Sequence, residues 1–123
     1  MDFVIDVMQS PEMGTQICVA FPDTKDAVRI FLHGVRKTNG IYTIYSWFDH
    51  NDWTFDSHSA EFESLQKFDV SFFCTNLLMS IVRRFCDSLR SLPAHVLIQK
   101  IQEHEQFPEM EKAVTEFIGR APK

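Results

Sequence analysis

Glycine is scarce in this sequence, with four residues among 123, and no two of them lie within five positions of each other. The chain therefore lacks the glycine-rich loop that cradles phosphates and the glycine fingerprint of dinucleotide-binding domains. It also has no Gly-x-Ser-x-Gly segment, which marks the nucleophile of many hydrolases. These absences exclude the classes of nucleotide-dependent enzyme and serine hydrolase that a local motif would reveal. We therefore predict that the protein has no cofactor.

Cysteine is also sparse, and the three residues Cys18, Cys74 and Cys86 contain no Cys-x-x-Cys pair. An odd number in apolar surroundings does not suit a disulfide framework. Structural zinc sites need paired ligands, so zinc binding through these cysteines is not expected. We predict three small buried hydrophobic residues in a reducing compartment.

Long apolar runs are missing, because no stretch approaches the roughly 20 residues that span a bilayer. The N-terminal segment carries Asp2 and Asp6 where a secretory signal would carry basic residues. We therefore expect a cytoplasmic protein with no membrane partner.

Positive charge is not in excess, and the net charge is −5. Much of it is concentrated between residues 49 and 69, where six carboxylates are accompanied by Lys67 alone: Asp49, Asp52, Asp56, Glu61, Glu63 and Asp69. Such a stretch repels phosphate and attracts basic surfaces, so we expect no direct nucleic-acid partner and favour a protein partner with a basic surface. The alternative is a solvated face that only keeps the chain in solution.

What the chain has in abundance is phenylalanine, with twelve residues that can fill a real core. Alternating or short apolar segments predict strands, which follow one another with short connections: residues 2–8, 16–21, 28–37, 41–49 and 53–56. Because every connection is too short for a parallel crossover, these segments predict an antiparallel meander of four to five strands over residues 2–56.

The second half has helical periodicity instead. Apolar residues recur at three- and four-residue spacing between Val70 and Leu89, and Ser59 or Asp69 can cap a helix before them. Pro93 and Pro108 suit the first turns of further helices at 93–105 and 108–118. The sequence thus predicts a single α+β domain over residues 1–123, with three to four helices between residues 60 and 118 packed on one face of the sheet. Residues 93–118 also admit a homodimer face as an alternative to internal packing.

The dipeptide Asn39-Gly40 is the strongest local signal, because it favours a two-residue hairpin turn. A regular hairpin with this turn pairs Thr38 with Ile41, Val35 with Ile44 and Gly34 with Tyr45. Continued without interruption, it pairs Leu32 with Trp47 and Phe31 with Phe48. Both faces of the ribbon then carry large apolar residues, so either both faces are covered or one of them binds a partner.

Aromatic residues beside carboxylates are typical of a protein interface in which charges steer the approach. The predicted partner-binding residues are Tyr42, Tyr45, Trp47, Asp49, Asp52, Trp53, Asp56 and Glu61.

Catalytic and metal-binding patterns are not evident. His50, Asp52, Asp56 and His58 form the only dense group of ligand types, and their spacing matches neither a calcium loop nor a zinc-protease helix. We therefore predict no metal site and no enzyme activity.

We expect a small acidic protein-binding module, most concretely a stoichiometric inhibitor of the immunity or antitoxin kind. Such a protein would mask a basic surface, for example on a toxin or nuclease. An adaptor or secretion chaperone fits the same features. The alternative from another class is a small enzyme or ligand-binding domain with His33, His50 or Tyr45 in a pocket between sheet and helices.

Overall fold

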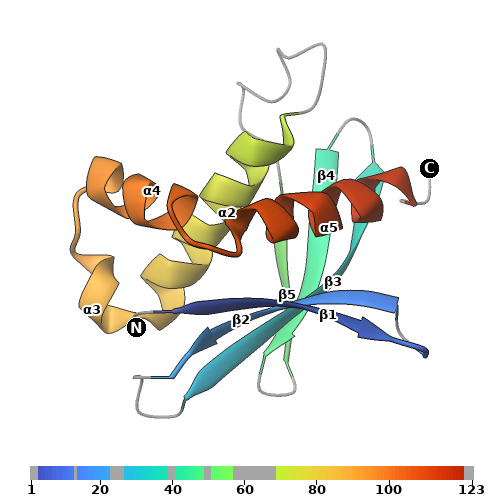
Figure 1. Ribbon diagram of the computed structural model, residues 1–123, viewed down its shortest axis with the longest axis horizontal. Helices are drawn as coiled ribbons and strands as arrows, with labels where there is room; N and C mark the ends of the chain where they lie inside the picture. Colours follow the sequence, from blue (N-terminus) through green and yellow to red (C-terminus); the bar gives the residue numbers. More distant parts are fainter. Residues whose placement is uncertain are drawn as a thin grey trace.

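The computed structural model describes residues 3–12, 14–22, 27–38, 41–48, 51–56 and 69–120, and at 37–38, 47–48 and 51–56 it describes the backbone alone. Within these ranges five antiparallel strands are followed by four helices (Figure 1). The strands lie side by side in chain order: β1 (Val4–Ser10), β2 (Gly14–Phe21), β3 (Val28–Thr38), β4 (Ile41–Phe48) and β5 (Asn51–Asp56). The predicted α+β class, a meander followed by helices, is confirmed.

The helices are α2 (Val70–Phe85), α3 (Asp87–Arg90), α4 (Ala94–Gln102) and α5 (Phe107–Gly119). Asp69 caps α2, since its carboxylate accepts a hydrogen bond of 3.0 Å from the backbone N–H of Phe72. The expected helix start at Ser59 lies outside the described residues. The apolar stripe predicted between Val70 and Leu89 is divided between α2 and α3, because the backbone at Cys86 is extended.

Two arginines hold the corner between α2 and α3 through each other's backbone. Arg83 donates to the carbonyl of Arg90 at 3.0 Å, and Arg90 donates to the carbonyl of Arg83 at 2.7 Å. Arg90 also forms an ion pair with Asp87 at 2.9 Å. These guanidinium groups therefore satisfy carbonyls that the helix break would otherwise leave without a partner.

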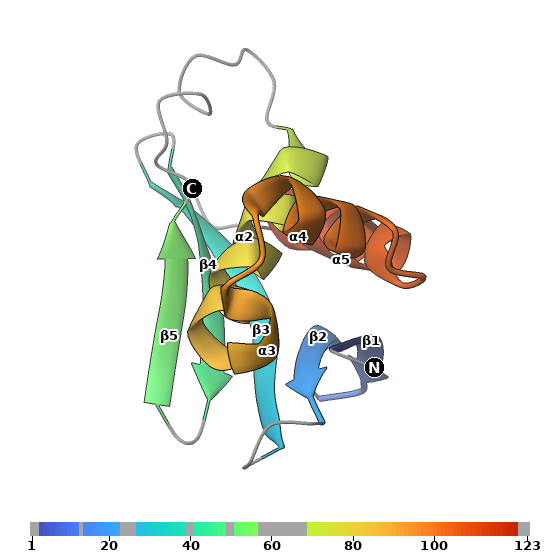
Figure 2. The same cartoon turned by 90° about the vertical axis from the view of Figure 1, so that its left-hand side faces the viewer.

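All four described helices lie on one side of the sheet, on the inner side of its bend (Figures 1 and 2). Helix α5 contacts β1, β2 and β3, while α2 packs mainly on α3, α4 and α5. Helix α5 makes more extensive contact with the strands than α2 does. The helical layer therefore rests on the sheet chiefly through its last helix.

The core lies between this layer and the sheet. Its largest fully buried side chains come from both layers: Phe21, Phe73, Ile5, Ile17, Ile30, Leu32, Ile44, Leu77, Leu78, Ile81, Leu97 and Ile101. Burying a side chain of this size contributes about 1.5–3 kcal/mol relative to leaving it in water. The described space between sheet and helices is thus occupied by apolar side chains.

One buried polar contact ties α5 to the first hairpin. The hydroxyl of Thr15, which is 3% exposed, lies 3.2 Å from both carboxylate oxygens of Glu116 and 2.9 Å from the side-chain amide of Gln9. Glu116 also forms an ion pair with Arg120 in the last turn. Because the carboxylate has both a hydroxyl and a guanidinium partner, its partial burial is compensated.

Candidate functional site

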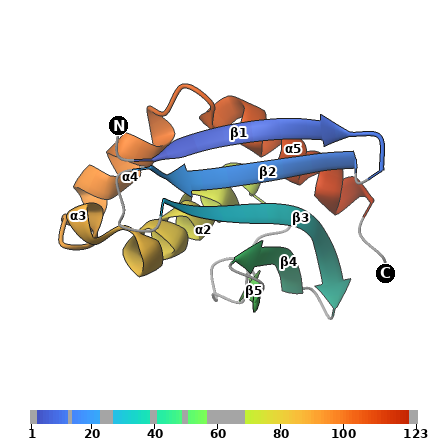
Figure 3. The ribbon, with the colours of Figure 1, turned by 90° about the horizontal axis from the view of Figure 1, so that it is seen from below.

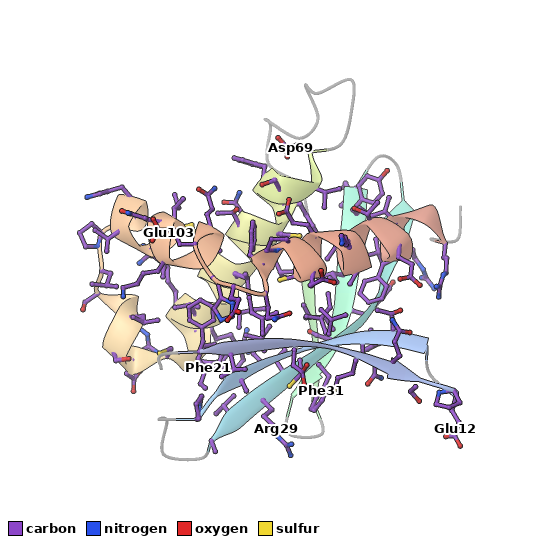
Figure 4. The ribbon with its side chains drawn as sticks, viewed as in Figure 1. Glu12, Phe21, Arg29, Phe31, Asp69 and Glu103 are labelled. Carbon is purple, nitrogen blue, oxygen red and sulfur yellow. The ribbon has the colours of Figure 1, made fainter. Side chains whose placement is uncertain are left out.

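The sheet has an outer face that points away from the helices, and none of the described helices covers it (Figure 3). Ile30 and Leu32 are fully buried on the helix side, so the alternation of β3 directs Arg29 and Phe31 outward. Figure 4 shows Arg29 projecting from this face beside Phe31. We define the outer face by Asp6, Cys18, Arg29, Phe31, His33, Arg36 and Tyr45.

A β-bulge in β3 decides which residues reach the outer face. Leu32 lies opposite Ser46 and Gly34 lies opposite Tyr45, which leaves His33 as one extra residue between the two pairs. Leu32 and Val35 are three positions apart and both are buried, an arrangement that an uninterrupted strand does not permit. The bulge lies in the strand that Figure 3 shows bending, and bulges increase strand bend and twist.

Two arginines of the outer face lie over aromatic rings. The guanidinium carbon of Arg29 is 5.8 Å from the centre of the Phe31 ring, and that of Arg36 is 5.8 Å from the centre of the Tyr45 ring. His33 stacks on Tyr45, with ring centres 6.3 Å apart and an interplanar angle of 23°. Each cation–π contact contributes about 0.5–1 kcal/mol at an exposed site, enough to bias a long side chain toward one orientation.

Both guanidinium groups keep their hydrogen-bond donors available. Both side chains are exposed. Over the described part of the chain, Arg29 and Arg36 have no hydrogen bond or ion pair. By contrast, Arg83, Arg90 and Arg120 donate to backbone carbonyls or carboxylates of this chain. Among the described residues, nothing therefore occupies the hydrogen-bond donors of these two cationic groups on the outer face.

The cysteine of the outer face is shielded in spite of its position. Cys18 lies between Asp6 and Phe31 in the cross-strand row and is 7% exposed. Burial raises the pKa of its thiol, the Arg29 charge lowers it in part, and Asp6 raises it again. Burial likewise raises the pKa of the Cys74 thiol, and Glu111 adds to the effect. Both thiols are therefore poor nucleophiles, and the expected buried, unpaired state of all three cysteines is confirmed.

Thiol labelling tests this assignment. At pH 8 the folded protein is expected to react with a disulfide reagent at least about tenfold more slowly than the urea-unfolded chain, because a raised pKa leaves less thiolate at that pH. The rate for folded protein should rise as the pH increases toward the raised values. Rapid labelling of one thiol in the folded state at pH 8 would contradict the placement of that residue.

The predicted partner-binding residues occupy different places. Tyr45 lies on the outer face, while Tyr42 is half buried against the core. By backbone register Trp47 is opposite Phe31 and Asp52, Trp53 is opposite Ser46, and Asp56 is opposite Thr43. Asp49 and Glu61 lie outside the described residues. The structure thus brings Tyr45 together with residues of β3 that the prediction did not include.

The residues of the outer face that the predicted partner-binding set did not include are Arg29, Phe31, His33 and Arg36. The predicted pairs Thr38–Ile41, Val35–Ile44 and Gly34–Tyr45 are confirmed, but the pairs Leu32–Trp47 and Phe31–Phe48 are wrong. The bulge moves Phe31 to the face of Tyr45 and Leu32 into the core. Gly34 was the available signal, since glycine inside a strand often marks a bulge.

Comparison with protein-family models, curated proteins and solved structures gives no match.

The residues named for an alternative catalytic pocket do not lie between sheet and helices where they are described. His33 and Tyr45 stack on the outer face, and His50 falls outside the described residues. Among described residues no group of histidine, cysteine, aspartate or glutamate side chains is arranged to hold a metal ion. None of the described helices is both long and apolar enough to cross a membrane.

Proposed function

We propose that this protein acts by binding another protein through the outer face of its sheet. The observation that carries the proposal is an aromatic and arginine cluster on a sheet face that no described helix covers. Tyrosine, phenylalanine and arginine are enriched in protein interfaces, because they combine large contact area with directed polar groups. The bulge and the cation–π contacts hold these groups in place before a partner arrives, which lowers the entropy cost of binding.

The more specific version is a stoichiometric inhibitor of the immunity or antitoxin kind. Its support is the acid-rich stretch from residue 49 to residue 69, which begins where β4 ends. By register Asp52 belongs to the cross-strand row of Phe31, and Asp56 belongs to the row of Arg36. Carboxylates beside an aromatic cluster favour docking on a partner with a basic surface. An adaptor or secretion chaperone would use the same face, because it also works by binding.

Affinity capture with matched variants tests the binding face. Wild-type protein, immobilised and exposed to a lysate of the cells that make it, is expected to retain a partner in a one-to-one ratio. The double variant Phe31→Ser/Tyr45→Ser should lose roughly tenfold or more in affinity for that partner. Phe72→Ser is the control, because Phe72 is an exposed aromatic residue on α2. Retention by the double variant together with loss by Phe72→Ser would place the interface on the helices instead.

Charge reversal tests the inhibitor version separately. Replacing Asp49, Asp52 and Asp56 by lysine is expected to slow association with a basic partner about tenfold or more at low ionic strength. The difference from wild type should shrink as salt is added, because salt screens the steering. Unchanged association rates at low salt would contradict the masking of a basic surface. They would not contradict binding through the outer face.

A further inference from the structure

The arginines of the outer face differ from Arg83, Arg90 and Arg120 in what they contact. Arg83 and Arg90 bond to each other's backbone, and Arg120 pairs with Glu116. Arg29 and Arg36 touch aromatic rings instead, and the described residues supply no carboxylate or carbonyl to either of them. A guanidinium held over a ring keeps the N–H groups at its edge available, and that edge fits a carboxylate or phosphate through two parallel bonds.

The spacing of the two arginines sets the size of the ligand. They lie seven residues apart on one strand, which is at most roughly 23 Å at the rise of an extended chain, and the bulge between them shortens the span. A small anion or metabolite cannot touch both groups at once. The occupant that uses both is a macromolecule that presents two anionic groups at a similar separation.

The chemistry of the face favours carboxylates over a phosphate backbone. Single-stranded nucleic acid would bind such a face by stacking bases on Phe31 and Tyr45. Those rings already have stacking partners in Arg29, Arg36 and His33, with which a base would compete. The net charge of −5 also repels a polyphosphate far more than it repels a few carboxylates.

We propose that Arg29 and Arg36 are the anchor points for carboxylates of an acidic segment on the partner protein. This inference rests on the proposed function, since it names the partner chemistry at the same face. The partner surface would then be mixed in charge, with carboxylates over β3 and basic groups toward the acid-rich stretch. Such a pattern fixes the orientation of the complex, because a reversed partner would bring like charges together.

A direct test uses a labelled poly-L-glutamate oligomer as the probe, with binding measured by fluorescence anisotropy at low ionic strength. Arg29→Gln/Arg36→Gln is expected to weaken binding about tenfold or more relative to wild type. Arg84→Gln/Lys100→Gln is the matched control, because it removes the same charge from exposed residues of the helical layer. It should change the affinity less than about twofold. Equal losses in the two double variants would overturn the inference in favour of a general charge effect.

Two further measurements sharpen the test. Arg29→Lys/Arg36→Lys keeps the charge but removes the planar fork, so it should bind more weakly than wild type if the carboxylates are held by paired bonds. Full affinity in that variant would contradict paired recognition. A polythymidine strand of equal length should bind more weakly than poly-L-glutamate, and tighter binding would assign the face to nucleic acid.

The outcomes separate this inference from the proposed function. If capture of the partner depends on Phe31 and Tyr45 but not on Arg29 and Arg36, the carboxylate anchors are wrong and the binding face stands. If poly-L-glutamate needs the arginines but no partner depends on the outer face, the anion-binding groups stand and the proposed function is wrong.

Discussion

Deletion of Phe31 is expected to destabilise the protein by at least about 4 kcal/mol, whereas deletion of His33, two positions later, should leave it folded. The difference follows from the bulge. Between Phe31 and Thr38 the register places each residue of β3 opposite one residue of β4, and His33 is the one extra residue, at the bulge. A deletion that shifts a strand by one residue moves each shifted side chain to the opposite face of the sheet. A deletion of the extra residue of a bulge causes no such shift.

Loss of Phe31 leaves two ways to pair the strand, and both damage the core. If the bulge is kept, Ile30 moves outward and Arg29 enters the fully buried position of Ile30. If the strand instead pairs without a bulge, Leu32 moves outward and His33 takes the buried position that Leu32 occupied. Removing one buried aliphatic side chain costs about 2–5 kcal/mol. Burying an arginine without a partner, or an imidazole without hydrogen bonds, adds several kcal/mol more.

Loss of His33 changes no pairing, because Leu32 remains opposite Ser46 and Gly34 remains opposite Tyr45. The cost includes the contacts of the His33 side chain, among them its stacking on Tyr45, and part of the strand's bend, together less than about 2 kcal/mol. Urea unfolding, followed by circular dichroism and tryptophan fluorescence, measures both variants. Similar stability of the two deletion variants would show that β3 is not held in the register described here.

The second large effect is expected at Phe73. Its side chain is fully buried in α2, within the core cluster that joins the helices to the sheet, so Phe73→Ala should lower the free energy of unfolding by about 3–5 kcal/mol. That loss is a large fraction of the 5–15 kcal/mol typical of a domain. The midpoint of urea unfolding should fall by about 1–3 M, given the usual dependence on denaturant.

The neighbouring residue supplies the control for this substitution. Phe72 is 38% exposed, so Phe72→Ala removes the same atoms from a partly solvated site. We expect a change below about 1 kcal/mol there. Equal destabilisation by the two substitutions would mean that the helix is rotated about its axis relative to the described packing.

The class and order of elements could be predicted because they depend on local patterns. Alternation in the first half and three- to four-residue spacing in the second half each report one buried face. The pairs nearest the hairpin turn could also be predicted, because a two-residue turn fixes the register of adjacent residues. From Thr38 to Gly34 the predicted and observed pairs agree.

Beyond Gly34 the prediction failed for a tertiary reason. Leu32 and Val35 are both drawn into the core, and the strand satisfies both only by accommodating His33 as an extra residue. The break at Cys86 has the same character, since no glycine or proline marks it. The backbone carbonyls at this break accept hydrogen bonds from Arg83 and Arg90. These partners become apparent only in three dimensions. The candidate site could not be assembled from the sequence because its members depend on the bulge.

The meander also has a consequence for biosynthesis. Each strand pairs only with its neighbours in the chain, so the hairpins can form as soon as they leave the ribosome. Helix α5, which contacts β1, β2 and β3, begins only at Phe107. At about 5–20 residues per second, several seconds separate the synthesis of β5 from that of α5. During that interval the apolar side of the nascent sheet lacks its final cover, and transiently exposed apolar strands of this kind are prone to aggregate.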